Sequence, residues 1–284
     1  MKGSRRIIPE LEHLRTLPLR SDRVIGRHKY PHYAVFVPFL SVEGETHWLF
    51  EKRSVTIRQG GEICFPGGAV ELKNGEHPEE GARRETAEEL GIPLEAVKIE
   101  GYLGHLFTRW GALIDVFYGT LSEAVYQHAT PSHLHRQSTS DAKESTSLNA
   151  PDPQGDKCAG EEPASQADGS LILDLHPKTD EVDVVFTVPI SFFQNTKPEV
   201  HLFRQVIQPR FKDSRGKLHS LPWRQLGLPP RYGGSFSFHT YPVYFYRYAG
   251  ETIWGITADI IRELLELLNL PKNGVHYQTG GKQS

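Results

Sequence analysis

Three glutamates, Glu85, Glu88 and Glu89, crowd the end of one predicted helix, "GARRETAEELGI" (residues 81–92). At 3.6 residues per turn, their carboxylates share one side of the helix. Each like-charge neighbour costs roughly 0.2–0.5 kcal/mol, and acids in the last turn also oppose the helix dipole by roughly 0.3–1 kcal/mol. A divalent cation would convert this repulsion into coordination, because Mg²⁺ prefers oxygen ligands. The alternative is a solvated face on which neighbouring arginines compensate the acids.

Two glycines precede this helix in the stretch "FPGG", at positions 67 and 68. Without a Cβ, Gly67 and Gly68 let the backbone turn sharply and approach a phosphate or a metal closely. An ordinary turn after a strand explains the same two glycines equally well.

Predicted elements around these residues would position them. Pro78 begins the helix and Gly91 ends it, as proline and glycine commonly do. Upstream, β-rich runs at residues 33–42 and 47–54 are joined by "EGET" and predict a hairpin. Strand-like runs return at residues 97–107 and 112–121. The order of strands, helix and strands indicates an α/β domain.

The stretch from about 126 to 170 is rich in Ser, Ala, Pro, Asp and Gln and nearly lacks large apolar residues. Such a segment cannot bury enough surface to offset its ordering entropy, so it is predicted to be a disordered insertion. Apolar runs resume at about residue 181 and end in a predicted hairpin, turning at Ala249 and Gly250, and a helix from about Thr257. One domain is therefore expected over residues 1–270, followed by a polar tail over 271–284.

Composition excludes several classes of function. The chain has 32 basic and 35 acidic residues, a net charge of -3, and so no general attraction for nucleic acid or an anionic membrane. No run approaches the roughly 20 apolar residues of a membrane span. Two cysteines, Cys64 and Cys158, suggest a reducing compartment rather than a disulfide framework. We expect a cytoplasmic protein; its oligomeric state stays open.

The segment "GAVELKNGEHPEEGARRETAEELGI", read from Gly68, resembles the Nudix box, the signature of Nudix hydrolases. Two details depart from that signature. Seven residues rather than five separate Gly68 from Glu76, and Thr86 occupies a site that is usually aliphatic. The first lengthens a surface loop, and the second is tolerable if the Thr86 hydroxyl bonds back to the helix backbone.

The resemblance implies a Nudix fold, an α/β/α sandwich with a mixed sheet, and hydrolysis of a diphosphate by water with Mg²⁺ or Mn²⁺. Glu85 and Glu89 would be the main metal ligands, and Glu88 a further ligand or the catalytic base. The carbonyl of Gly68 would complete the metal's shell. The resemblance also implies that Arg84 orients the glutamates and that Glu76 pairs with Arg84.

A second resemblance concerns the substrate. "LFEKRSVTIRQGGEICFPGG" (residues 49–68) resembles the segment before the box in the coenzyme A diphosphatase branch. Glu51 replaces a residue that is usually threonine there, and the spacing from Arg58 to Gly61 is one residue short. The resemblance implies cleavage of coenzyme A or its derivatives to 3′,5′-ADP and 4′-phosphopantetheine. Arg53, Arg58 and Gly67 would bind the phosphates, since guanidinium offers paired donors.

Alternatives stay open at this point. Arg53 is equally read as a surface charge on a strand. An aromatic group would line a pocket for adenine or the pantetheine arm, or pack in a core hairpin: Phe236, Phe238, His239, Tyr241 and Tyr244. A Nudix hydrolase for NADH or ADP-ribose is the alternative enzyme. A non-catalytic Nudix-fold binding module would be expected to lack some of the acidic positions, all of which are present.

Overall fold

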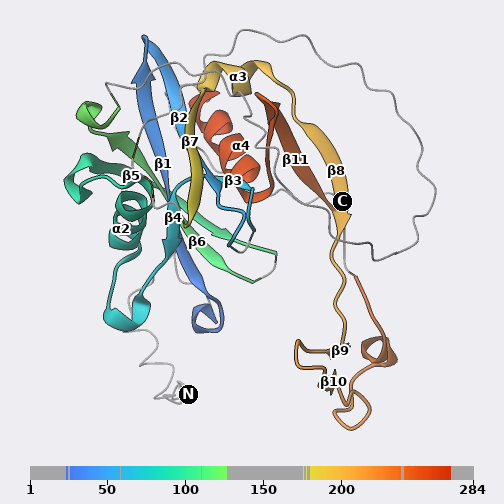
Figure 1. The fold of residues 1–284 in the computed structure, drawn as a ribbon. Helices are drawn as coiled ribbons and strands as arrows, with labels where there is room; N and C mark the ends of the chain where they lie inside the picture. The colour runs from blue at the N-terminus through green and yellow to red at the C-terminus, as the bar shows by residue number, and fades with distance from the viewer. Residues whose placement is uncertain are drawn as a thin grey trace, which may run out of the picture.

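A mixed seven-stranded sheet lies between two helices in the computed structural model of the chain (Figure 1). The structure describes residues 24, 26–57, 59–109, 111–126, 175, 177, 180–237 and 240–269. Five strands follow the order β3-β2-β1-β6-β5, while β4 pairs with β1 and β7 with β2. The β1–β6 pairing is parallel and the others are antiparallel. The strands are β1 (His32–Val42), β2 (Glu45–Arg53), β3 (Ile63–Cys64), β4 (Gly67–Ala69), β5 (Val97–Phe107), β6 (Leu113–Leu121) and β7 (Val182–Pro189).

The predicted hairpin is confirmed in β1 and β2, which pair from Phe39 opposite Trp48 to Val42 opposite Glu45. The two turn residues, Glu43 and Gly44, have φ of 51° and 85°. Positive φ at both central residues is the geometry that follows the twist of a tight hairpin.

The predicted carboxylate helix is α2 (Pro78–Leu90), which ends where Gly91 adopts a left-handed conformation with φ 65°. Its first turn is secured by Glu80, whose carboxylate accepts the His77 N–H at 2.9 Å. Thr86 is fully buried, and its hydroxyl donates to the Ala82 carbonyl at 2.7 Å. The expected bond back to the helix backbone is therefore confirmed, and α2 can lie close to the sheet.

The opposite face of the sheet is covered by α4 (Gly255–Asn269), which begins two residues before the predicted start. It follows the predicted hairpin of β11 (Thr240–Tyr248) and β12 (Glu251–Trp254), where Ala249 and Gly250 form the turn. β8 (Glu199–Arg204) pairs with β11 and completes a three-stranded sheet. The short helix α3 (Ile190–Asn195) links β7 to this part of the molecule.

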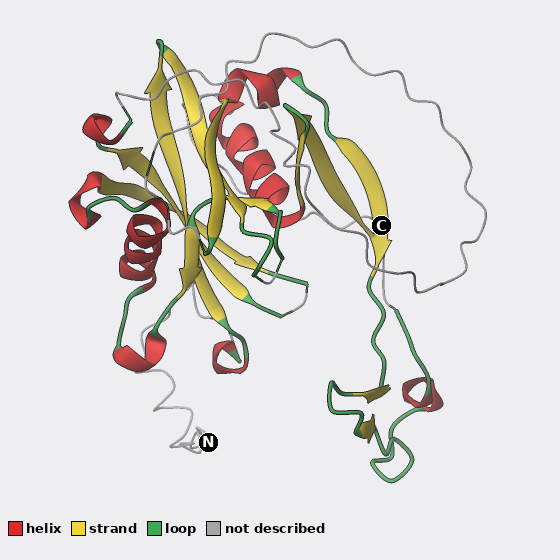
Figure 2. Ribbon diagram, in the orientation of Figure 1, coloured by secondary structure: helices red, strands yellow, loops and turns green. Residues whose placement is uncertain are grey.

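A small lobe extends from the β8–β11 ribbon, away from the main sheet (Figure 2). It contains β9 (Arg210–Lys212), β10 (Leu218–Ser220) and the 3₁₀ turn η5 (Pro230–Gly233). An antiparallel bridge between Ile207 and Phe236 closes its base. The other 3₁₀ turns are η1 (Arg27–Lys29), η2 (Leu72–Asn74), η3 (Leu94–Ala96) and η4 (Glu123–Val125).

The two faces of the sheet bury separate apolar clusters, as alternation along the strands requires. On the α2 side, Phe36 and Leu49 pack with Leu90. On the α4 side, Trp48 and Phe50 pack with α4. The expected α/β/α sandwich with a mixed sheet is therefore confirmed.

The part of the predicted insertion that runs from 127 to 170, and the tail at 271–284, lie outside the described residues. No helix within the described ranges combines the length and apolar character needed to cross a membrane.

Candidate active site

The carboxylates of α2 lie in three different environments. Glu89 is buried, with 4% of its surface exposed, and Glu85 is partly buried. The Glu88 side chain is 53% exposed. Glu85 and Glu89 line one large cavity of about 1200 Å³, whereas Glu88 is not part of its wall. The structure therefore brings two of the three crowded carboxylates to a common cavity.

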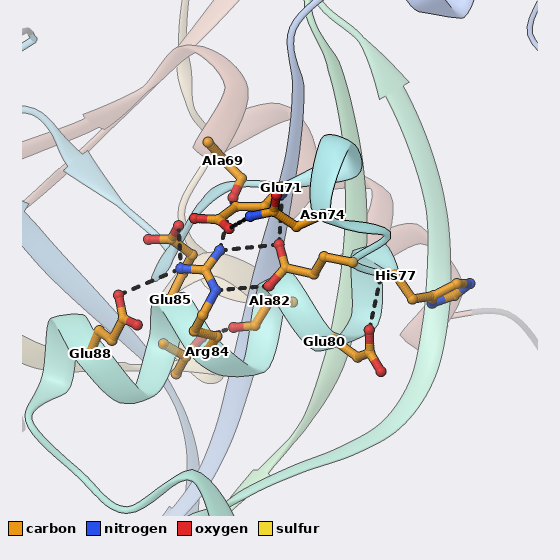
Figure 3. A network of polar contacts seen from close by, with 11 residues as sticks. Ala69, Glu71, Asn74, His77, Glu80, Ala82, Arg84, Glu85 and Glu88 are labelled. Atoms are coloured by element: carbon orange, nitrogen blue, oxygen red, sulfur yellow. Dashed lines mark hydrogen bonds and ion pairs between the residues drawn. The ribbon is translucent and has the colours of Figure 1, made fainter.

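Arg84 contacts several acidic side chains on and beside this helix (Figure 3). Its Nε and Nη2 donate to the two oxygens of Glu76 at 2.8 and 3.2 Å, and its Nη1 donates to Glu85 at 2.9 Å. Further contacts run to Glu88 at 3.5 Å and to the Ala69 carbonyl at 3.1 Å. These bonds raise the pKa of the Arg84 guanidinium and lower the pKa of Glu76. A paired, planar donor of this kind fixes carboxylates in orientation as well as in charge.

The two glycines of β4 lie directly against these carboxylates. The Gly67 N–H donates to Glu89 Oε2 at 2.8 Å. A Cβ on Gly67 would lie 2.3 Å from the Ala34 carbonyl oxygen, and a Cβ on Gly68 would lie 2.4 Å from the Glu85 carboxylate. Close approach of the β1 backbone therefore requires glycine at 67, whereas a side chain at 68 would displace the end of the Glu85 side chain.

Burial raises the pKa values of the two α2 carboxyl groups that line the cavity. Loss of water raises the pKa of Glu89, and the nearby Glu51 carboxylate raises it further, against the N–H of Gly67. Burial also raises the pKa of Glu85, against the hydrogen bond from Arg84. A further cation close to these carboxylates would favour their charged forms.

Glu51 contacts Cys64 of the cavity wall without itself lining the cavity. The sequence marks Glu51 only as a departure from a family pattern. It is fully buried in β2, and burial raises its pKa. Cys64 Sγ, on the facing strand, donates to its Oε1 at 3.2 Å. The signal that can find such a residue is a single acid within a buried apolar strand, "HWLFEKR".

Two arginines are predicted from the sequence to bind phosphate. Arg53 lines the cavity, and its Nε is buried without a hydrogen-bond partner among the described residues. Arg58 lies outside the described residues.

The far wall of the cavity is largely apolar and comes from distant segments. Phe203 of β8 and Tyr241 of β11 contribute to it, together with Ile260 of α4. The Arg109 guanidinium lies 3.5 Å above the centre of the Tyr241 ring, and Gln205 donates to the Arg109 carbonyl at 2.7 Å. Of the predicted aromatic group, Tyr241 alone among the described members lines the cavity, and Phe238 and His239 lie outside the described residues.

Three observations show that these residues fit a divalent cation. The donors are carboxylates with the carbonyl of Gly68 beside them, which is an all-oxygen set. Glu51 Oε2 is buried without a hydrogen-bond partner among the described residues. Gly68 packs against Glu85 where a Cβ would collide. Within the described part of the chain, no three acidic, histidine or cysteine side chains are gathered as a ligand set. Arg84 binds Glu85 and contacts Glu88 there.

Comparison with known proteins gives one family. Residues 30–150 match the NUDIX domain. The chain is 25% identical over 238 residues to Nudix hydrolase 3 of Caenorhabditis elegans, covering 83% of this chain and 72% of that one. It is 32% identical over 104 residues to the uncharacterized Nudix hydrolase NudL of Photorhabdus laumondii, covering 36% of this chain and about half, 54%, of that relative.

Among solved structures, the chain is similar to the NUDIX domain of Shewanella oneidensis NrtR complexed with ADP ribose, at 18% identity and a TM-score of 0.28. That match covers 40% of this chain and 72% of the other. The C. elegans Ap4A hydrolase matches at 21% identity and a TM-score of 0.27, covering 32% and 68%.

Proposed function

We propose that this chain, whose residues 30–150 match the NUDIX domain, is a Nudix hydrolase and that its substrate is coenzyme A or a derivative. Hydrolysis of the diphosphate would give 3′,5′-ADP and 4′-phosphopantetheine. The observation that carries the proposal is the lining of one cavity, with Glu85 and Glu89 in one wall and Phe203 and Tyr241 in another. A substrate with a diphosphate beside a long, weakly polar arm suits such a lining. The sequence before the box, with Arg53 and "FPGG", supports the same branch.

The proposed chemistry assigns a task to each group of the site. Glu85, Glu89 and the Gly68 carbonyl would hold Mg²⁺ or Mn²⁺, and Glu88 would be a further ligand unless it serves as the base. When bound, such a cation neutralises charge on the phosphoryl oxygens and lowers the pKa of water. Arg84 orients Glu85 through its 2.9 Å hydrogen bond.

The remaining assignments concern the proton and the phosphates. Glu88, exposed on the helix flank, would act as the base that takes a proton from the attacking water. Glu76 fixes Arg84 through two hydrogen bonds. Arg53 would bind a phosphate oxygen, because this residue lines the cavity and a guanidinium offers paired donors.

The test is mass spectrometry of products formed from coenzyme A, NADH and ADP-ribose, each with Mg²⁺ or Mn²⁺. We expect metal-dependent 3′,5′-ADP from coenzyme A. A Glu89→Gln control should lose at least about 100-fold in rate, because metal stabilisation supplies several kcal/mol and about 1.36 kcal/mol is tenfold. Circular dichroism checks that the variant is folded.

The other outcomes are equally informative. Cleavage of NADH or ADP-ribose without coenzyme A would contradict the proposed substrate and favour the alternative enzyme. Binding of these compounds without any cleavage would favour a non-catalytic module. The presence of all the acidic positions argues against that module.

A further inference from the structure

The small lobe, residues 208–235, carries a charge opposite to that of the rest of the chain. It contains six basic residues and one acidic residue, a net charge of +5, whereas the whole chain carries -3. The residues outside the lobe therefore carry -8. The total charge predicts no general attraction for an anionic membrane, but a positive charge concentrated on one projecting element attracts an anionic surface locally.

The basic side chains of the lobe are not neutralised by neighbouring acids. The acidic residue, Asp213, contacts His219 Nε2 at 2.9 Å. Its other carboxylate oxygen accepts two backbone N–H groups of the same turn, each at 3.0 Å. Within the part of the chain that the structure describes, none of the six basic side chains makes an ion pair: Arg210, Lys212, Arg215, Lys217, Arg224 and Arg231.

One face of the β9–β10 hairpin combines positive charge with an exposed apolar side chain. Lys212 lies opposite Leu218, and Arg210 lies opposite Ser220, so these four side chains share one face. Leu218 is 50% exposed, and Leu226 in the following loop is 58% exposed. Basic side chains beside exposed leucines suit the interface of a bilayer, where cations meet lipid phosphates and apolar groups reach the acyl chains.

A pocket of about 390 Å³ lies in the same lobe, and Arg210 of this face lines it. Arg224 lies 5.0 Å above the Trp223 ring, and both residues line the pocket together with Tyr232. Gly233 lets the indole lie here, since a Cβ on Gly233 would come 2.7 Å from Trp223 Nε1. Arginine offers paired donors to a phosphate, and Trp and Tyr are enriched at the level of lipid headgroups.

We propose that the lobe docks on a membrane surface rich in anionic phospholipid, and that its pocket takes a lipid phosphate. Leu218 and Leu226 would reach toward the acyl chains. The acidic remainder of the chain would face away from the membrane, because an anionic surface repels it. Single-stranded nucleic acid would also attract the basic face, but its bases stack on aromatic rings and use no exposed leucine. The proposal does not depend on the substrate of the cavity.

The test is co-sedimentation of the full chain with phosphatidylcholine vesicles, with and without roughly one-third phosphatidylserine. We expect binding to the phosphatidylserine vesicles alone, and its loss as NaCl rises from about 0.05 to about 0.5 M. Arg210→Glu with Lys212→Glu should weaken binding at least about tenfold. The matched control, Lys73→Glu with Lys98→Glu, changes the net charge equally at two exposed lysines outside the lobe and should bind nearly as wild type does.

A second pair of variants tests the apolar contact. Leu218→Ser with Leu226→Ser should weaken binding to the phosphatidylserine vesicles by about tenfold, because less apolar surface enters the bilayer. The matched control is Leu72→Ser with Leu94→Ser, at positions 48% and 44% exposed outside the lobe, which should bind as wild type does. Melting temperatures show that each variant is folded.

Several results would overturn the proposal. These are no binding of wild type to phosphatidylserine vesicles, equal binding to both kinds of vesicle, and wild-type binding by the folded Arg210→Glu, Lys212→Glu variant. Binding of a single-stranded RNA oligonucleotide without vesicle binding would assign the basic face to nucleic acid instead. Because the comparison of vesicles and of salt uses wild type, it decides the question even if a lobe variant fails to fold.

Discussion

At the scale of single residues, the geometry of the site depends on how closely the β4 backbone and the carboxylates of α2 pack against one another. Gly68 permits the Glu85 carboxylate to lie against the β4 backbone, since a Cβ there would come within 2.4 Å of it. Arg84 then fixes the outer edge of the same carboxylate at 2.9 Å. Small displacements of a ligand matter, because positioning residues around a metal typically change affinity or activity by about 10- to 100-fold.

Gly68→Ala is predicted to lose metal-dependent hydrolysis by about 10- to 100-fold while remaining folded. The new methyl group meets only the flexible end of the Glu85 side chain, which can move aside and so leave its position. Initial rates against metal concentration, with thermal melting, measure both effects. Gly234→Ala is the control, because a methyl group there would have no atom of the described residues within 4 Å beyond its chain neighbours; equal activity in the two variants would contradict the prediction.

Arg84→Lys is predicted to lower kcat by about 10- to 100-fold with a small change in melting temperature. Lysine keeps the positive charge but cannot make the paired bonds to Glu76 at 2.8 and 3.2 Å while also holding Glu85. Steady-state kinetics would reveal the loss. A wild-type kcat would show that charge alone, rather than orientation, is what Arg84 contributes.

Residue spacing alone predicts Glu85, Glu88 and Glu89 as a group, because one short helix carries all three. It does not predict that Glu85 and Glu89 share a cavity while Glu88 stays exposed, since that depends on how α2 is rotated against the sheet. Glu51 is harder still to predict, because β7 pairs with β2 and includes Val185 opposite Glu51. That pairing joins segments far apart in the chain.

At the scale of elements, Asp115 of β6 contacts side chains from two neighbouring strands, β1 and β5. Lying on β6, it accepts a hydrogen bond from Tyr102 of β5 at 2.6 Å and contacts His32 of β1 at 2.5 Å. Burial raises the pKa of Asp115, and these hydrogen bonds with the nearby Arg27 more than offset it, so the pKa lies below its ordinary value. The strand runs themselves are predictable from sequence, but the parallel β1–β6 contact is not, because it joins segments far apart in the chain.

The contribution of Asp115 to the free energy of unfolding is predicted to disappear in acid. A carboxyl with a lowered folded-state pKa binds more protons when unfolded, so its stabilisation is present above an unfolded pKa of about 3.9 and is lost as pH falls through the folded value. Urea unfolding of wild type should therefore weaken more steeply below about pH 4 than that of Asp115→Asn. At neutral pH, Asp115→Asn should cost roughly 1–3 kcal/mol. Parallel pH profiles would contradict this account.

At the scale of the whole molecule, the lobe beyond Ile207 and Phe236 is separate from the cavity that Glu85 and Glu89 line. Reciprocal backbone hydrogen bonds of 2.8 and 3.1 Å between these two residues bring the two chain segments together at its base. No residue from 208 to 235, a range that the structure describes in full, lines the cavity. The sequence shows apolar runs here but does not predict that the ribbon carries them away from the main sheet, because that outcome depends on pairing across the lobe.

Replacing residues 208–235 by Asn-Gly, a favoured two-residue turn, is predicted to preserve folding and coenzyme A hydrolysis. The reason is that the bridge already holds the flanking strands at hairpin distance. Melting temperature and product formation are compared with wild type, and sedimentation velocity reports the oligomeric state. Loss of hydrolysis in a folded variant would assign the lobe to substrate binding or to assembly.

The cavity's two walls come from separate stretches of the gene. The proposed metal-binding and catalytic groups lie between Gly68 and Glu89 in the sequence, whereas Phe203, Tyr241 and Ile260 of the apolar wall lie far downstream. Mutation or recombination in the downstream stretch can therefore alter which molecule is accepted while inheriting the cleavage machinery intact. Duplicated copies of such a gene would be expected to diverge in substrate before they diverge in chemistry.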